Sequence, residues 1–158
     1  MPNRALGAAP CFSERKHDQS VSLTTSTIRI LAVDDHPQFR QGLAALLATQ
    51  PDMKLVAEAS NGREAIELYR THCPDITLMD LQMPEMNGLS AIATIRGEFP
   101  EARIIVLTTY SDDAQVVRAM QVGARAYLLK NLLYKELLKT IRAVHGLTST
   151  PTTPPITS

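Results

Sequence analysis

Five short apolar runs alternate with segments of helical period through the middle of this 158-residue chain. The runs are rich in β-branched residues and leucine and are bounded by turn residues, a pattern typical of strands. We therefore predict strands at Ile30–Val33, Leu55–Ala59, Ile76–Met79, Ile104–Leu107 and Ala126–Leu129. Because these runs are almost continuously apolar, we expect both faces of the sheet to be covered.

The intervals between the predicted strands carry apolar residues three and four positions apart, which is the period of an amphipathic helix. Pro37 suits the first turn of the first helix, and Asn61, three residues before Glu64, predicts the N-terminal cap of the second. Gly123 predicts the end of the fourth. The inward face of the first helix is predicted at Phe39, Leu43, Leu46 and Leu47. Strict alternation of strands and helices predicts an α/β fold, with a parallel sheet, right-handed crossovers and helices on both faces.

The two ends of the chain differ in composition from its middle. Residues 1–27 are rich in serine, threonine and charged residues without periodicity, so we expect a flexible, disordered leader. Residues 148–158 are rich in proline and threonine, which is typical of an extended linker or tail. We therefore expect one domain at residues 28–147, followed either by a linker whose second domain has been cut away or by a short tail.

Charge and hydropathy weigh against several classes of function. Lys plus Arg and Asp plus Glu both number 16, so the chain lacks the basic excess that nucleic-acid binding usually requires. No apolar run approaches the roughly 20 residues that cross a bilayer, and no basic cluster followed by an apolar stretch opens the chain. We therefore expect a cytoplasmic protein without a membrane partner.

Aspartates stand at the ends of two predicted strands. Asp34 and Asp35 follow the first strand, and Asp80 follows the third. In a doubly wound sheet of strand order 2-1-3-4-5 these strands are neighbours, and ligands bind beyond their carboxyl ends. Two such charges about 4 Å apart repel by roughly 4 kcal/mol at an effective dielectric constant of 20, so we expect a cation among them. Mg²⁺ fits best, because it binds one or two carboxylates and shares its other positions with waters and phosphate oxygens.

Four segments occur in the order and at the separations of a known family. They are "VDDH" after the first strand, "LMDLQMPEMNG" around the third, "VLTTY" at the fourth and "GARAYLLK" at the fifth. Together they resemble the receiver domain of two-component response regulators, over about three quarters of the chain. Asn131 follows Lys130 where many receivers have proline, which resembles the subgroup that precedes helix-turn-helix DNA-binding domains. The resemblance implies a flavodoxin-like doubly wound (βα)5 fold.

The resemblance implies a phosphoacceptor site at the three aspartates. Asp80 would accept a phosphoryl group from a sensor histidine kinase. Asp34 and Asp35 would hold Mg²⁺ together with Asp80 and the backbone carbonyl of Gln82. The chain would thus be a signalling domain that assists only its own phosphorylation and dephosphorylation, and not an enzyme acting on other substrates.

The resemblance also implies a two-state switch. Lys130 would pair with the phosphoryl oxygens, and Thr108 would hydrogen-bond to them through its hydroxyl. The inward movement of Thr108 leaves a space into which Tyr127 rotates, changing the surface of the fourth helix, fifth strand and fifth helix. The expected consequences are a phosphorylation-dependent homodimer and the regulation of transcription, with DNA bound only through a domain absent from this chain.

Each of these residues also has a plainer interpretation. Paired aspartates often cap a helix in solvent, and a lysine at a strand end is usually solvated. Thr108 is a good strand former, and Tyr127 suits the edge of a sheet. For His36, next to the paired aspartates, we favour the start of a helix over a metal ligand or a phosphohistidine.

Two other classes of protein remain as alternatives. The first is a receiver-like module that binds partners without being phosphorylated, against which the complete set of acceptor, metal, lysine and threonine positions argues. The second is a phosphatase with an aspartate nucleophile, but such enzymes carry Asp-x-Asp after the first strand, whereas Asp34 and Asp35 are adjacent. A flavin or dinucleotide carrier is disfavoured because no glycine-rich or Thr/Ser-rich phosphate loop follows the first strand.

Overall fold

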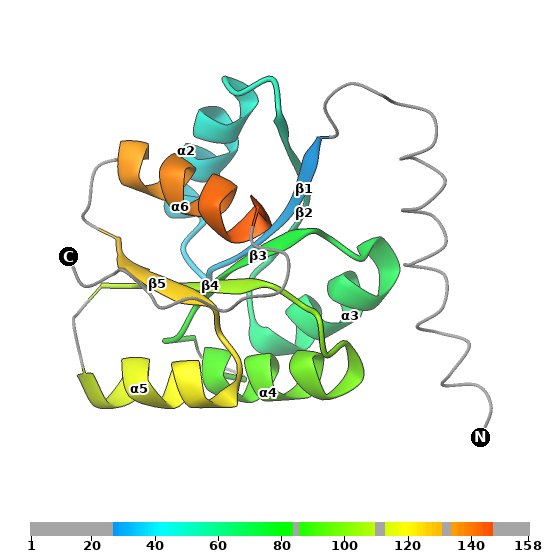
Figure 1. Cartoon of the computed structure of the whole chain (residues 1–158), viewed down its shortest axis with the longest axis vertical. Helices are drawn as coiled ribbons and strands as arrows, with labels where there is room; N and C mark the ends of the chain where they lie inside the picture. The colour runs from blue at the N-terminus through cyan, green and yellow to red at the C-terminus, as the bar shows by residue number, and fades with distance from the viewer. Residues whose placement is uncertain (1–26, 84–85, 110–112, 131–133, 147–158) are drawn as a thin grey trace.

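The computed structural model describes residues 27–83, 86–109, 113–130 and 134–146. Apart from Thr27, the predicted leader and tail lie outside the described residues, as does Asn131. Within the described residues five strands alternate with five helices (Figure 1). The strands are β1 (Ile28–Val33), β2 (Met53–Ala59), β3 (Ile76–Asp80), β4 (Ile104–Thr108) and β5 (Ala126–Leu129). The helices are α2 (Pro37–Ala48), α3 (Gly62–His72), α4 (Gly88–Glu98), α5 (Asp113–Val122) and α6 (Tyr134–Gly146).

The strands form one parallel sheet of order β2-β1-β3-β4-β5, as the sequence predicts. In Figure 1, α2 and α6 cover one face of this sheet, and α3, α4 and α5 cover the other. The central strands β3 and β4 are buried along their whole length, whereas the edge strand β5 is only partly buried. The fold is therefore the doubly wound α/β fold with helices on both faces.

Four strands are longer than predicted. β1 and β2 begin two residues earlier than the apolar runs, and β3 and β4 end one residue later. The register pairs Asp80 with Leu107 and Thr108 with Leu129, so both polar residues belong to the sheet. Strand pairing uses backbone groups and continues past the last apolar side chain. Asp80 is therefore held by a central strand rather than by the loop that follows it.

Two apolar clusters fill the two sides of the sheet, because successive side chains of a strand point to opposite faces. From β1, Leu31 and Val33 enter the cluster shared with α3, α4 and α5, and Ile30 and Ala32 enter the cluster shared with α2 and α6. The predicted inward residues of α2 all contribute: Leu43 and Leu47 are buried, and Phe39 and Leu46 pack partly buried against the same cluster.

Local signals in the sequence set the ends of several helices. Pro37 lies in the first turn of α2. The Asn61 side chain accepts a hydrogen bond from the Glu64 N–H at 2.9 Å, and Glu64 Oε1 accepts one from the Ser60 N–H at 2.8 Å. Gly123 follows α5 with φ of 125°, a conformation that glycine adopts without steric cost. In the part of the chain that the structure describes, none of the helices is both long and apolar enough to cross a membrane.

Candidate functional site

The neighbouring strands β1 and β3 bring the three predicted aspartates together. Val33 pairs with Met79, so the residues that follow them, Asp34 and Asp80, lie side by side at the carboxyl edge of the sheet. Both residues are buried, with exposed fractions of 1% and 3%. Asp34, Asp35, His36 and Asp80 each offer a ligand atom, and these atoms lie within 4.8 Å of one another. The predicted convergence of acids from separate parts of the chain is present, and their roles stay predictions.

Lys130 reaches the same place from the end of β5. Its Nζ lies 2.5 Å from Asp34 Oδ2 and 3.6 Å from Asp80 Oδ2, and its side chain is only 12% exposed. The Lys130 N–H donates to the carbonyl of Thr108 at 2.7 Å, which fixes the lysine backbone to the end of β4. Thr108 is itself buried there. The predicted lysine is therefore placed against two of the three carboxylates.

Tyr127 lies on β5, in register with Val106 of β4. It is partly buried and packs against the cluster formed with α3, α4 and α5. Its predicted movement together with Thr108 concerns the change from the unphosphorylated to the phosphorylated state, and it stays a prediction.

The loop after β3 folds back onto Asp80. The Gln82 N–H donates to Asp80 Oδ1 at 3.2 Å. The Gly88 N–H donates to the carbonyl of Leu81 at 3.1 Å. A Cβ at Gly88 would collide with the Asp80 carbonyl oxygen, so only glycine allows α4 to start this close to the strand. This close contact between Gly88 and Asp80 depends on the tertiary fold.

His36 and Arg40 are site residues that the sequence did not assign to the site. His36 stands at the N-cap position of α2, at the start of the helix as predicted, and its Nδ1 lies 2.9 Å from Asp34 Oδ1 and 3.1 Å from Asp35 Oδ1. Its N–H donates to the same Asp34 oxygen at 2.8 Å. Arg40 donates to the Asp34 carbonyl at 2.5 Å and to Glu58 at 3.1 Å, tying the end of β1 to β2. No sequence signal identifies Arg40, because its partners lie on two different strand segments.

The charges in this pocket are incompletely compensated. Asp34 Oδ2, Asp35 Oδ1 and Asp80 Oδ2 are buried, and none receives a hydrogen bond of good geometry from a described residue. Burial, followed by the neighbouring charge of Asp34, raises the pKa of Asp80 to about 6, even though Lys130 and the Gln82 N–H act in the opposite direction. Two of the three buried oxygens lie near the Lys130 ammonium and the third lies near His36 Nδ1. Carboxylate oxygens grouped in this way fit a hard divalent cation such as Mg²⁺, which prefers oxygen ligands.

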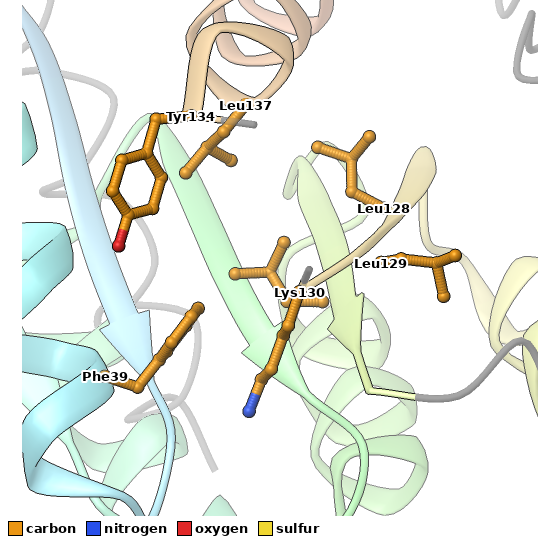
Figure 2. Close-up of a pocket in the computed structure, with 7 residues that line it drawn as sticks. Phe39, Leu128, Leu129, Lys130, Tyr134 and Leu137 are labelled. Atoms are coloured by element: carbon orange, nitrogen blue, oxygen red, sulfur yellow. The ribbon is translucent and has the colours of Figure 1, made fainter. Parts of the chain in front are cut away.

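A small apolar cleft lies beside the lysine (Figure 2). Its volume is about 20 Å³, enough for about one water molecule and too small for an organic ligand. The residues that line it belong to α2, β4, β5 and α6, together with Lys130, which directly follows β5. They are Phe39, Leu107, Leu128, Leu129, Lys130, Tyr134 and Leu137.

The fold and its acidic edge place the chain among doubly wound α/β domains whose site lies at the carboxyl ends of the strands. The family described as "Response regulator receiver domain" matches residues 30–142, and the chain belongs to this family. The chain is 48% identical over 119 residues to "Uncharacterized transcriptional regulatory protein YhcZ" of Bacillus subtilis, an alignment that covers 75% of this chain and 55% of that protein.

Two further similarities agree with this family. "Transcriptional regulatory protein LiaR" of Bacillus subtilis is 44% identical over 116 residues, covering 73% of this chain and 55% of LiaR. The crystal structure of a two-component response regulator of the LuxR family from Aurantimonas sp. SI85-9A1 superposes with a TM-score of 0.73 at 39% identity, covering 76% of this chain and 86% of that one. The chain thus spans about half the length of the curated relatives it matches.

Proposed function

We propose that this receiver domain accepts a phosphoryl group on Asp80 from a sensor histidine kinase, in a reaction that depends on Mg²⁺. The observation that carries the proposal is the pocket at the carboxyl edge of the sheet, where buried Asp80 lies with Asp34 and Asp35 beside the ammonium of Lys130. A buried carboxylate with a raised pKa, such as Asp80, inside a cluster of charged groups is typical of a functional site. The finding that the relatives are response regulators supports the same reading.

In the proposed reaction a carboxylate oxygen of Asp80 attacks the phosphorus, and the bond between phosphorus and the imidazole nitrogen of a phosphohistidine breaks. The nitrogen keeps the electron pair, so the histidine is restored and an acyl phosphate is formed. Asp80 has a pKa of about 6 and is therefore mainly ionised at neutral pH, as a nucleophile must be. Its position at the end of a buried strand fixes the direction of attack.

Asp34, Asp35, Asp80 and the backbone carbonyl of Gln82 would hold the metal ion. When bound, Mg²⁺ supplies positive charge that offsets the carboxylates and the phosphoryl oxygens. Lys130 binds phosphoryl oxygens from the other side, moving from Asp34 toward the group on Asp80. In this way the residues of the pocket position the reactants and balance their charge.

The proposed output begins at Thr108. Its hydroxyl moves toward the phosphoryl oxygens, Tyr127 rotates inward, and the surface formed by α5, β5 and α6 changes. We propose that this change promotes homodimerisation and regulates transcription through a DNA-binding domain outside these 158 residues. The names of the relatives, which are transcriptional regulators, support this output. As for other response regulators, we propose the cytoplasm as its location.

Phosphoryl labelling tests the proposal. Purified protein incubated with Mg²⁺ and acetyl phosphate should gain one base-labile phosphoryl group by intact-mass spectrometry, and Asp80→Asn should gain none. Asp52→Asn is the matched control, since Asp52 is an aspartate at the opposite edge of the sheet, and it should be labelled like the unaltered protein. Equal labelling of Asp80→Asn would move the acceptor elsewhere. No labelling of the unaltered protein would favour the binding module that works without phosphorylation.

The phosphatase alternative predicts turnover, whereas a phosphoacceptor is labelled once per molecule until its acyl phosphate hydrolyses. We expect no sustained release of phosphate from p-nitrophenyl phosphate at enzyme-like rates. Many turnovers that require Asp80 would identify the chain as an enzyme instead.

A further inference from the structure

The ammonium group of Lys130 lies against an aromatic ring as well as against carboxylates. Its Nζ is 4.6 Å from the centroid of the Phe39 ring, well inside the roughly 6 Å over which a ring face attracts a cation. Phe39 comes from α2 and Lys130 from the end of β5, and Figure 2 shows the ring and the lysine facing each other across the cleft. The contact therefore joins two segments that are 91 positions apart in the sequence.

The backbone alone does not place this ammonium. Hydrogen bonding between Lys130 and Thr108 fixes the main chain, but four rotatable bonds separate the Cα from Nζ. Apolar side chains, Leu107, Leu129 and Leu137 among them, line the cleft along the lysine stem. Such a wall accommodates the methylene groups but gives no direction to the charge. The ring face and the carboxylates are the groups that set where the charge lies.

A ring face suits this position better than another acid would. Three carboxylates already share the pocket, and a fourth would increase the repulsion among them. It would also pair with the Lys130 ammonium, whose positive charge the phosphoryl group needs. The attraction of a ring is not restricted to a single hydrogen-bond direction. The ammonium can therefore shift from Asp34 Oδ2, now at 2.5 Å, toward Asp80 Oδ2, now at 3.6 Å, and stay close to the ring.

We propose that Phe39 is a positioning residue for phosphoryl transfer, whose ring holds the Lys130 ammonium between Asp34 and Asp80 before the phosphoryl group arrives. This inference rests on the proposed function, because it concerns the lysine of the phosphoacceptor site. The competing explanation is packing, since Phe39 also contacts the apolar cluster under α2. The two explanations depend on different properties of the ring. Positioning of the ammonium requires the electron density of the ring face, whereas packing requires only the volume of the ring.

The test is a series of fluorinated phenylalanines placed at position 39 alone by stop-codon suppression. Fluorine withdraws electrons from the ring face and scarcely alters its shape, so the attraction falls stepwise from one to three fluorines. With Mg²⁺ and acetyl phosphate, the rate constant for labelling Asp80 should fall stepwise, by about two- to fivefold for the trifluorinated ring. Phe39→Leu should slow labelling by a similar factor, and Phe39→Tyr should preserve it.

Phe99 supplies the matched control. It is a buried phenylalanine that packs on Tyr69 with a centroid distance of 4.8 Å, on the other face of the sheet. The same fluorinated series at Phe99 should leave the rate of labelling unchanged. A flat series at Phe39, or equal slopes at Phe39 and Phe99, would overturn the proposal in favour of packing.

A second measurement tests the contact without any phosphorylation. A ring face shifts the NMR signals of nearby protons upfield, so the Lys130 ε-methylene protons should be shifted in the unaltered protein and not in Phe39→Leu. Normal labelling with no ring-dependent shift would overturn this inference and leave the proposed function intact. Absence of labelling in the unaltered protein would overturn both.

Discussion

At the amino edge of the sheet one aspartate is paired with an arginine, whereas at the carboxyl edge three aspartates lie around one lysine that contacts only two of them. Asp52, just before β2, receives hydrogen bonds at 2.9 Å from both Nε and an Nη of Arg142 on α6. At the other edge, Lys130 contacts Asp34 and Asp80, and three buried carboxylate oxygens receive no well-formed hydrogen bond from a described residue. The negative charge of the carboxylates is thus compensated at the amino edge and only partly compensated at the carboxyl edge.

The pKa values of the two aspartates move in opposite directions. The hydrogen bond from Arg142 lowers the pKa of Asp52 below its ordinary value of 3.8, so folding favours its charged form. Burial and the charge of Asp34 raise the pKa of Asp80 to about 6, so folding opposes its charged form. The amino edge therefore supports the fold, and the carboxyl edge holds a site that a cation would stabilise.

Removing the lysine should give the largest change in stability. Lys130→Met leaves buried Asp34 and Asp80 without their cation, and breaking a buried ion pair from one side costs about 3–5 kcal/mol. We expect a loss of this size in the free energy of urea unfolding at pH 8 without Mg²⁺. At pH 5 the loss should be smaller, because Asp80 is then mainly protonated. An equal loss at both pH values would show that packing of the lysine stem dominates.

Neutralising the acceptor should stabilise the fold. Because the pKa of folded Asp80 lies above 3.8, its ionisation destabilises the protein, fully above about pH 6 and not at all well below pH 4. A rise to about 6 corresponds to about 3 kcal/mol. Asp80→Asn should therefore raise the free energy of unfolding by up to about 3 kcal/mol at pH 8, and the gain should fade as the pH is lowered to 4. If Asp80→Asn destabilised the protein at pH 8, the negative charge at the carboxyl edge would not be in excess, which would contradict the comparison.

Magnesium should compensate the excess negative charge at the carboxyl edge and so stabilise the folded protein. A ligand at 100 times its dissociation constant stabilises the folded state by about 2.7 kcal/mol if it binds only that state. We expect Mg²⁺ to raise the unfolding temperature relative to EDTA in the unaltered protein and in Asp52→Asn, but hardly at all in Asp35→Asn. The same rise in Asp35→Asn would place the ion elsewhere.

A substitution at the amino edge should change the free energy of unfolding least. Arg142→Met removes an exposed ion pair, and such pairs contribute about 0–1 kcal/mol. We expect a loss within that range at pH 7, which disappears as Asp52 is protonated below pH 4 and shrinks in 1 M NaCl. Phosphoryl labelling by acetyl phosphate should be unchanged. A slower rate in Arg142→Met would show that the two edges are coupled.

The order and type of the secondary-structure elements follow from local patterns in the sequence. Apolar runs and helical periods predict all five strands, their alternation with helices and, with the strand order, the meeting of Asp34, Asp35 and Asp80. Capping signals such as Asn61 also appear where predicted. These features are local, or follow from the rule that parallel strands end at one edge, so they can be read without coordinates.

Which side chains surround the aspartates at each edge depends on how distant segments of the chain pack together. Asp52 meets Arg142 across 90 positions, and Phe39 meets Lys130 across 91. Phe39 has the helical spacing of a core residue, and nothing in that spacing distinguishes a packing ring from one that holds a cation. Such pairs depend on how α2 and α6 are seated on the sheet and on side-chain reach over a few ångströms. Periodicity specifies a face of a helix, and only packing in three dimensions specifies the neighbour.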